Sequence, residues 1–288
     1  MAKKLLASVM AFALCLFVSA ADMVVKGKNG EDRKINVVDT SETFLRFKIL
    51  SDSTVEVTIT PSYRGHKSIS IPEKVQIEGK VHTVTSIGVL AFAGCSSLNS
   101  INIPEGVTSI GVEAFGGCSS LTNIKIPEGV TSIGYKAFYG CDNLEPKLLI
   151  YDKGTKCYGW VGDKKKCTEV VIPEGVTSIG YSAFYKCSSL TSIKNPEGVT
   201  SIREEAFWGC YSLNSIKIPE GVTSIGYKAF YGCSSLTSIK IPESVTSIEE
   251  RAFNGCSNLE IVIDNSKENV KVGDFAFDGC KSVKWLKN

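Results

Sequence analysis

One stretch of sequence recurs along this chain at a fixed interval. Residues 126–141 read IPEGVTSIGYKAFYGC, and close copies begin at Ile103, Ile172, Ile218 and Ile241. The cysteine that ends each copy marks a step of 23 residues, which joins Cys95, Cys118 and Cys141, and later Cys187, Cys210, Cys233 and Cys256; the step to Cys280 is 24. A fixed period of about 20 to 29 residues is typical of solenoids, in which each unit buries its apolar face only against its neighbours. The sequence therefore predicts a repeat solenoid.

Each unit predicts two short extended segments and a tight turn. Residues 121–126 alternate apolar and polar side chains as a strand does, and Pro127 and Gly129 then turn the chain. Residues 130–133 form a second extended piece, and residues 137–141 a tight turn or a single helical turn. Stacked in register, about nine such units would form a parallel sheet lined inside by rows of Ile, Val and Phe. Asn195 is a polar exception, since other units have an inward isoleucine there.

The first 20 residues have the composition of a secretory signal peptide. A basic start at Lys3 and Lys4 precedes an apolar run of about 14 residues and a small-residue end at Ala20. The alternative is a membrane anchor, but a span needs roughly 20 apolar residues. No later segment is apolar enough to cross a membrane. We therefore expect a secreted or cell-surface protein, with residues 1–20 removed as the signal peptide.

Residues 21–68 precede the repeats and are expected to form a small β-rich N-terminal cap. Residues 35–38, 44–50 and 54–60 are rich in β-branched residues and largely alternate in polarity. A cap there would cover the first open end of the solenoid at 69–288, which would otherwise expose core and unpaired backbone.

The repeat pattern Leu-x-x-Ile-x-Ile-Pro-x-x-Val-x-x-Ile-x-x-x-Ala-Phe-x-x-Cys resembles the BspA-type leucine-rich repeat, over about residues 69 to 288. The resemblance implies a right-handed leucine-rich-repeat solenoid in a bacterial surface or secreted protein. It also implies a protein partner, possibly a host extracellular-matrix or cell-surface protein, to which the chain would attach.

One unit, residues 142–167, departs from the repeat. The step from Cys141 to Cys187 stays at 46 residues, two periods, but the unit lacks both the Ile-Pro-Glu-Gly and the Ala-Phe-x-x-Cys words, and it adds Cys157 and Cys167. In an exported protein, two cysteines ten residues apart favour a disulfide, and the alternative is two free thiols. A local departure that the scaffold does not require is a candidate for function or for drift. Tyr158 and Trp160 are therefore secondary candidates for ligand binding.

The remaining polar residues give no catalytic or metal pattern. The repeat cysteines form no Cys-x-x-Cys pair and are best interpreted as small buried side chains. His66 and His82 lie outside the regular units, and the acidic and Lys residues recur as solvated rows. A net charge of +2 gives no electrostatic footprint for nucleic acid. We expect no enzyme, no metal, no cofactor and no nucleic-acid partner.

Aromatic residues that flank the Ala-Phe pair are the leading binding candidates. They fill a variable slot of the unit and would align when units stack: Tyr135, Tyr139, Tyr181, Tyr185, Trp208, Tyr227 and Tyr231. Exposed Tyr and Trp are enriched at binding hot spots; alternatively, these rings pack over neighbouring turns. The sequence favours a non-catalytic adhesion or protein-binding module. The alternatives are an envelope scaffold without a host ligand and a glycan-binding surface.

Overall fold

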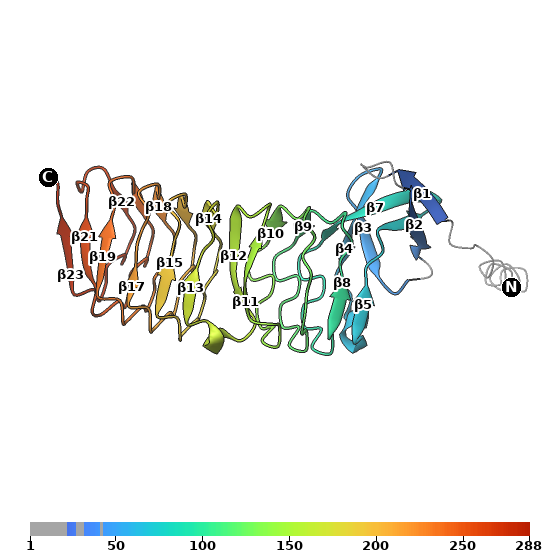
Figure 1. Ribbon diagram of the computed structural model, residues 1–288, viewed down its shortest axis with the longest axis horizontal. Coiled ribbons are helices and arrows are strands. Elements are labelled where there is room, and N and C mark those ends of the chain that lie inside the picture. The colour runs from blue at the N-terminus through green and yellow to red at the C-terminus, as the bar shows by residue number, and fades with distance from the viewer. Residues whose placement is uncertain (1–21, 27–31, 41–42) are drawn as a thin grey trace, which may run out of the picture.

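The computed structural model describes residues 22–26, 32–40 and 43–288, so the predicted signal peptide at 1–20 lies outside the described residues. The chain forms an elongated solenoid of stacked turns with a sheet at its N-terminal end (Figure 1). This confirms the predicted fold class. Apart from strands, the described ranges contain the 3-10 segments η3 (Pro61–Gly65) and η4 (Lys164–Lys166). Residues 137–141 form a tight turn and not a helical turn. Its hydrogen bonds join residues three apart, for example Cys141 N donating to Phe138 O at 3.3 Å.

Each regular unit contributes to two columns of short parallel strands. The first column holds mostly segments that begin with Ser-Ile: β5 (Ser68–Ser70), β8 (Ser100–Asn102), β13 (Glu169–Val171), β15 (Ser192–Lys194), β17 (Ser215–Ile216), β19 (Ser238–Ile241), β21 (Glu260–Ile263) and β23 (Ser282–Trp285). The second column holds mostly Ser-Ile pairs: β9 (Ser109–Ile110), β10 (Ser132–Ile133), β14 (Ser178–Ile179), β16 (Ser201–Ile202), β18 (Ser224–Ile225), β20 (Ser247–Ile248) and β22 (Lys271–Val272). Equivalent residues pair across units, as Ile179 with Ile202. The predicted parallel sheet is therefore a set of narrow sheets.

The N-terminal sheet merges with the first units. Its strand order is β1-β2-β6-β7-β4-β3, formed by β1 (Asp22–Lys26), β2 (Asp32–Asp39), β3 (Arg46–Ile49), β4 (Thr54–Thr58), β6 (Lys74–Ile77) and β7 (Lys80–Ile87). The insertion in the first repeat forms the antiparallel β6–β7 hairpin, and β7 continues into the second column by pairing with β9. The buried ring of Tyr63 lies 5.1 Å from that of Phe92 and so covers the first phenylalanine of the core.

The core is built from ladders of identical side chains. Phe92, Phe115 and Phe138 stack with ring centroids 5.4 Å apart, and a second stack begins at Phe184 and Phe207, 5.3 Å apart. The break between Phe138 and Phe184 coincides with the degenerate unit. Buried residues accordingly form two clusters that meet in this unit: Leu149 and Val161 belong to the N-terminal cluster, and Cys157 and Cys167 to the C-terminal one. Each buried apolar side chain contributes roughly 1.5 to 3 kcal/mol, so these rows supply most of the stability.

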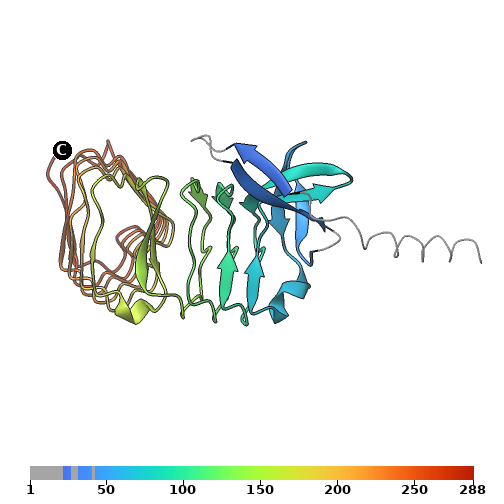
Figure 2. The ribbon, with the colours of Figure 1, turned by 45° about the vertical axis from the view of Figure 1, so that its right-hand side comes forward.

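The degenerate unit folds as an antiparallel hairpin of β11 (Lys147–Tyr151) and β12 (Lys156–Val161). β12 pairs with β14, whereas β10 pairs only with β9 among the described strands, so the second column is interrupted before the hairpin. Figure 2 shows the C-terminal units almost end-on while the N-terminal units are still seen from the side. The stack therefore changes direction at the hairpin.

The predicted disulfide between Cys157 and Cys167 is not formed, and both are buried free thiols. The reason is that they belong to different rows. Cys157 lies in β12 opposite Ile179, in the second strand column. Cys167 follows η4 and its thiol neighbours that of Cys187. It therefore extends the column of repeat cysteines into the degenerate unit, although it stands off the 23-residue step.

The repeat cysteines lie inside as predicted. Seven are buried, and Cys280 in the last unit is partly exposed. Several donate to the carbonyl of a phenylalanine in the previous unit, as Cys118 Sγ to Phe92 O at 3.2 Å. A thiol is a weak donor, so these contacts orient the cysteines in one direction along the column.

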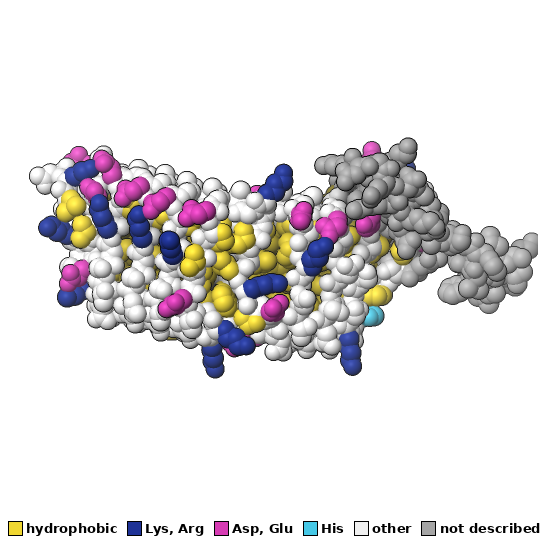
Figure 3. Space-filling view, viewed as in Figure 1, with side chains coloured by type: hydrophobic (Ala, Val, Ile, Leu, Met, Phe, Trp, Pro, Cys, Tyr) yellow, Lys and Arg dark blue, Asp and Glu magenta, His cyan; other side chains and the backbone are white. Residues whose placement is uncertain are grey.

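Charged rows cover one face of the C-terminal units, where Figure 3 shows cationic side chains running beside acidic ones. Several ion pairs join successive units: Lys125 Nζ lies 2.7 Å from Glu105 Oε1, and Lys217 pairs with Glu197. These side chains are largely exposed, and such pairs contribute about 0 to 1 kcal/mol each.

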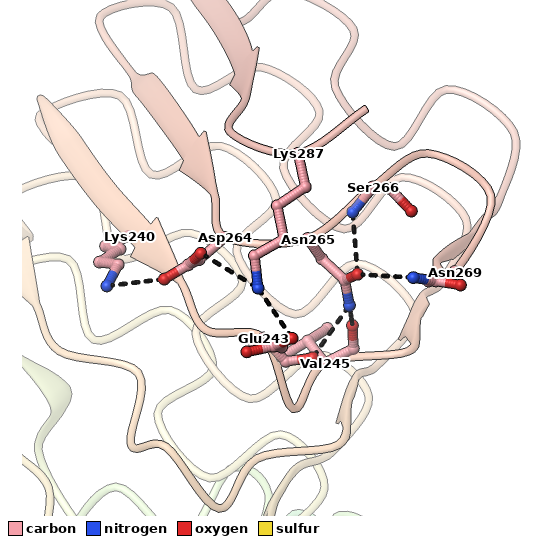
Figure 4. A network of polar contacts seen from close by, with 8 residues as sticks. All are labelled: Lys240, Glu243, Val245, Asp264, Asn265, Ser266, Asn269 and Lys287. Carbon is pink, nitrogen blue, oxygen red and sulfur yellow. Dashed lines mark hydrogen bonds and ion pairs between the residues drawn. The ribbon is translucent and has the colours of Figure 1, made fainter.

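A buried asparagine organises the polar network of the last units (Figure 4). Asn265 Nδ2 donates to Glu243 O at 2.9 Å, and Asn265 Oδ1 accepts from the amide of Ser266 at 2.8 Å and from Asn269 Nδ2 at 3.3 Å. Lys287 closes the exposed side through Glu243 at 2.7 Å. The network thus satisfies a turn that lacks the usual Pro.

Candidate functional site

The seven predicted aromatic residues lie on successive turns beside the phenylalanine stacks, and we call them the aromatic stripe. Four of them form a continuous row: ring centroids are 6.2 Å apart for Tyr139 and Tyr185, 5.3 Å for Tyr185 and Trp208, and 5.3 Å for Trp208 and Tyr231. Tyr135 and Tyr181 form a second contact at 6.4 Å. The stripe therefore bridges the degenerate unit, since Tyr139 and Tyr185 belong to units on either side of it.

The rings of the stripe are only partly available to a ligand. Tyr139 and Tyr181 are 50% and 44% exposed, whereas Tyr135, Tyr185, Trp208, Tyr227 and Tyr231 are half-buried. Both interpretations left open by the sequence apply: the rings pack against one another, and their outer edges form a surface.

Lysines that the sequence did not single out lie among these rings. Lys136 Nζ is 4.6 Å from the ring centroid of Tyr135 and 4.8 Å from that of Tyr185. Lys228 Nζ is 4.7 Å from both Trp208 and Tyr227. A cation over an aromatic face is worth about 0.5 to 1 kcal/mol at an exposed site. The stripe is consequently a surface of alternating aromatic and cationic groups.

In regular units, the turn around the Ala-Phe pair is joined to the same turn of the next unit by three backbone hydrogen bonds. The degenerate unit has no such turn. Typical bonds run from Glu113 N to Tyr135 O, from Phe115 N to Ala137 O and from Gly117 N to Tyr139 O. At the degenerate unit, Phe138 N donates instead to the hydroxyl of Tyr158 at 3.0 Å, and on the other side Trp160 N donates to Ala183 O at 2.8 Å. Two groups of β12 therefore stand in for a missing turn.

Gly159 makes this substitution possible. Its φ is +119°, and a Cβ at this position would lie 1.9 Å from Ala183 O. Only glycine allows β12 to approach the following turn so closely.

The missing turn leaves a cavity of about 240 Å³, which we call the notch. Its walls combine aromatic, cationic and acidic side chains: Tyr139, Asp142, Trp160, Lys164, Tyr185 and Lys186. Tyr158 separates it from a second cavity of similar volume beside Tyr151 and Arg203. Burial raises the pKa of Tyr158 well above its ordinary value, so this hydroxyl stays protonated.

A buried carboxylate lies behind two residues that line the notch, Lys136 and Ser182. Glu205 is 6% exposed and its Oε2 accepts from Tyr135 Oη at 2.7 Å and from Ser182 Oγ at 3.0 Å. Lys136 Nζ lies 3.5 Å from the same oxygen. Tyr135 and Lys136 thus reach across the degenerate unit to an acid in the second regular unit beyond it. Burial raises the pKa of Tyr135, with the nearby Glu205 adding to the effect.

The two secondary candidates of the sequence lie in β12, and both make structural contacts. Tyr158 is turned toward Phe138, with ring centroids 5.4 Å apart, and its hydroxyl replaces a carbonyl. Trp160 lines the notch and donates its indole N–H to Asp163 O at 3.1 Å. The sequence analysis did not identify Lys136, Lys186 and Glu205. Of these three, only Lys186 could have been noticed from the repeat pattern, because the other units have glycine at its position.

The described chain contains no cluster of three or more His, Cys, Asp or Glu side chains suited to a metal ion. Among the same residues, no helix has the length and apolar character to cross a membrane. The fold is a leucine-rich-repeat solenoid whose distinctive features are an aromatic stripe and a notch at one irregular unit.

Comparison with protein families matched the BspA type leucine rich repeat region, in six copies, over residues 66–148 and 162–284. The chain therefore belongs to the BspA-type leucine-rich-repeat family. The unmatched gap at 149–161 falls within the β11–β12 hairpin, which agrees with the irregular structure there. A search of curated proteins found no match.

Solved structures of the same architecture come from bacterial proteins. A leucine rich cell surface protein of Faecalibacterium prausnitzii is 26% identical, with a TM-score of 0.50; the alignment covers 83% of this chain and 74% of that one. The pneumococcal vaccine antigen PcpA is 15% identical, with a TM-score of 0.53 and coverage of 94% and 89%. The second likeness concerns the fold alone.

Proposed function

We propose that this protein is exported and acts as a non-catalytic adhesion module at the cell surface, binding a host matrix protein or a protein of another cell. The observation that carries the proposal is the aromatic stripe, in which exposed Tyr139 and Tyr181 adjoin half-buried rings and two lysines. Tyr and Trp are among the residues that dominate binding energy at protein interfaces, and the scaffold does not require aromatic residues in this slot.

Family membership and a relative that is a cell surface protein support the location. The repeat architecture supports the mode of binding, because stacked units present the same slot along an extended surface. The predicted signal peptide at 1–20 supplies the export step in this proposal.

The test is binding of the chain from Ala21 onward to immobilised, purified matrix proteins, measured by surface plasmon resonance. Tyr139→Ala combined with Tyr181→Ala removes the two most exposed rings and should weaken binding at least about tenfold, as expected for hot-spot residues. Tyr211→Ala is the matched control: Tyr211 is 52% exposed and has no ring contact with the stripe among the described residues. Equal loss in both variants would contradict the proposal, and so would unchanged binding by the double variant.

A further inference from the structure

The notch differs from the rest of the aromatic stripe in two ways: it is concave, and lysine side chains gather at it. Lys164 and Lys186 line it, with Asp142 as the carboxylate among the lining residues, and Lys165 and Lys166 continue the basic run next to it. The chain as a whole has a net charge of only +2. A concave site lined by cations attracts an anionic group.

The size and walls of the notch restrict that group further. Its volume of about 240 Å³ is below the range of about 300 to 1,000 Å³ that holds a drug-sized ligand, so it fits a single ring-sized unit. Aromatic walls from Tyr139, Trp160 and Tyr185 offer apolar surfaces against which a sugar ring can pack. An aspartate or glutamate side chain would leave most of these walls uncovered.

We propose that the notch binds one uronic acid unit of an anionic polysaccharide. The cations Lys164 and Lys186 would hold the carboxylate, the rings of Tyr139 and Tyr185 would contact the sugar ring, and Asp142 would accept from its hydroxyls. This site shares two tyrosines with the aromatic stripe, but its ligand is a sugar acid and the proposal goes beyond attachment to proteins.

The backbone at Lys186 supports the assignment independently. Lys186 occupies the turn position that is Gly117 or Gly140 in earlier units and Gly209 in the next, and it adopts the same left-handed conformation with φ of +57°. Its amide keeps the regular bond to Trp208 O at 2.7 Å. A side chain in this conformation is strained relative to glycine. Two turns of this kind border the notch, at Gly140 and Lys186, and Lys186 is the one that carries a side chain. A lysine at this position is therefore not required by the fold.

The test is isothermal titration of a tetrasaccharide that contains glucuronic acid into the chain from Ala21 onward, at low ionic strength. The matched ligand is the same tetrasaccharide with its carboxyl groups reduced to alcohols. Lys186→Gly installs the residue that other units already carry, so the variant should fold normally while the affinity falls about tenfold, as for loss of one charge-assisted contact. Lys164→Gln is the second variant and should give a similar loss. Lys125→Gln removes an exposed lysine from outside the notch and should leave the affinity unchanged.

Several outcomes would overturn the proposal. They are absence of binding by the unaltered chain, equal affinity for the reduced tetrasaccharide, or unchanged affinity in Lys186→Gly. Binding of Lys186→Gly to matrix proteins, measured in parallel, separates this result from the adhesion proposal, because that assay depends on the exposed tyrosines and can succeed or fail on its own.

Discussion

At the scale of single residues, the hydroxyl of Tyr158 has the clearest structural role. It accepts from the amide of Phe138, which in a regular unit would donate to the carbonyl of an alanine. The sequence shows Tyr158 only as an aromatic residue in an irregular segment, which makes it a candidate for ligand binding. Its role as a substitute acceptor depends on a contact between β12 and the preceding turn that no pattern in the sequence encodes.

Tyr158→Phe should destabilise the protein by about 1 to 3 kcal/mol, because it leaves the Phe138 amide without a partner in a partly buried site. Urea denaturation followed by circular dichroism measures the change. Tyr211→Phe is the control, since Tyr211 is 52% exposed and its hydroxyl should contribute little. Equal stability of Tyr158→Phe and the unaltered chain would show that water replaces the hydroxyl.

Asn195 is the polar defect that the sequence places in an isoleucine row, and the structure confirms that it is buried. Its Nδ2 donates to Lys217 O at 3.1 Å, but its Oδ1 has no partner. Asn195→Ile should raise stability by about 1 kcal/mol, because an apolar side chain replaces an unsatisfied acceptor.

The control is Asn265→Ile, at a second buried asparagine in the C-terminal stack. Asn265 is equally buried, but all of its polar atoms are satisfied, so the same substitution should be destabilising there. Thermal denaturation of both variants measures the contrast. A fall in melting temperature for Asn195→Ile would refute the interpretation of that site as a defect.

At the scale of elements, buried free thiols make the stability depend on pH in the alkaline range. Burial raises the pKa of Cys95 to about 11 and that of Cys157 to about 12. In the unfolded chain the same thiols ionise near pH 8.5 to 9. Between these values the unfolded chain has released protons that the folded chain still holds, so the free energy of unfolding decreases as the pH rises.

We therefore expect a urea midpoint that is nearly constant from pH 6 to 8 and falls between pH 9 and 11. Each such thiol contributes about 1.4 kcal/mol per pH unit in this window. Cys157→Ala, a replacement of similar size, should reduce the slope. A flat profile up to pH 11 would contradict the burial of free thiols and would instead favour disulfides.

The elements that repeat along the chain could be predicted from the sequence. The β11–β12 hairpin, which occurs once, could not. The inward rows, the turns and the cysteine column follow from a period seen many times in the chain. The hairpin of β11 and β12 has no second copy, so its pairing partner and the approach of Gly159 to Ala183 could not be inferred. The expected disulfide was wrong for the same reason: it assumed that neighbours in sequence are neighbours in the stack.

At the scale of the whole molecule, the degenerate unit divides the solenoid into two stacks. The core separates into two clusters there, and the Ala-Phe turn on each side of the hairpin keeps one hydrogen bond to it, where the Ala-Phe turns of regular units are joined by three. In a solenoid, stability is close to a sum of units and interfaces between neighbours. The weakest interface should therefore lie at the hairpin.

Hydrogen exchange measured on peptides should show two groups of protected amides, one before and one after residues 147–161, with different opening free energies. Tyr158→Phe should widen the difference by weakening the junction. A single common opening energy along the whole solenoid, unaffected by that substitution, would show that the two stacks unfold as one unit.

The central claim is that the outer rings of the aromatic stripe hold a protein partner. Its most direct test is surface plasmon resonance of the unaltered chain, the Tyr139→Ala/Tyr181→Ala variant and the Tyr211→Ala control on purified matrix proteins, with folding of each checked by circular dichroism. We predict specific binding by the unaltered chain and the control, and a loss of at least about tenfold in the double variant. Equal binding by all three folded proteins, or binding by none, would contradict the claim.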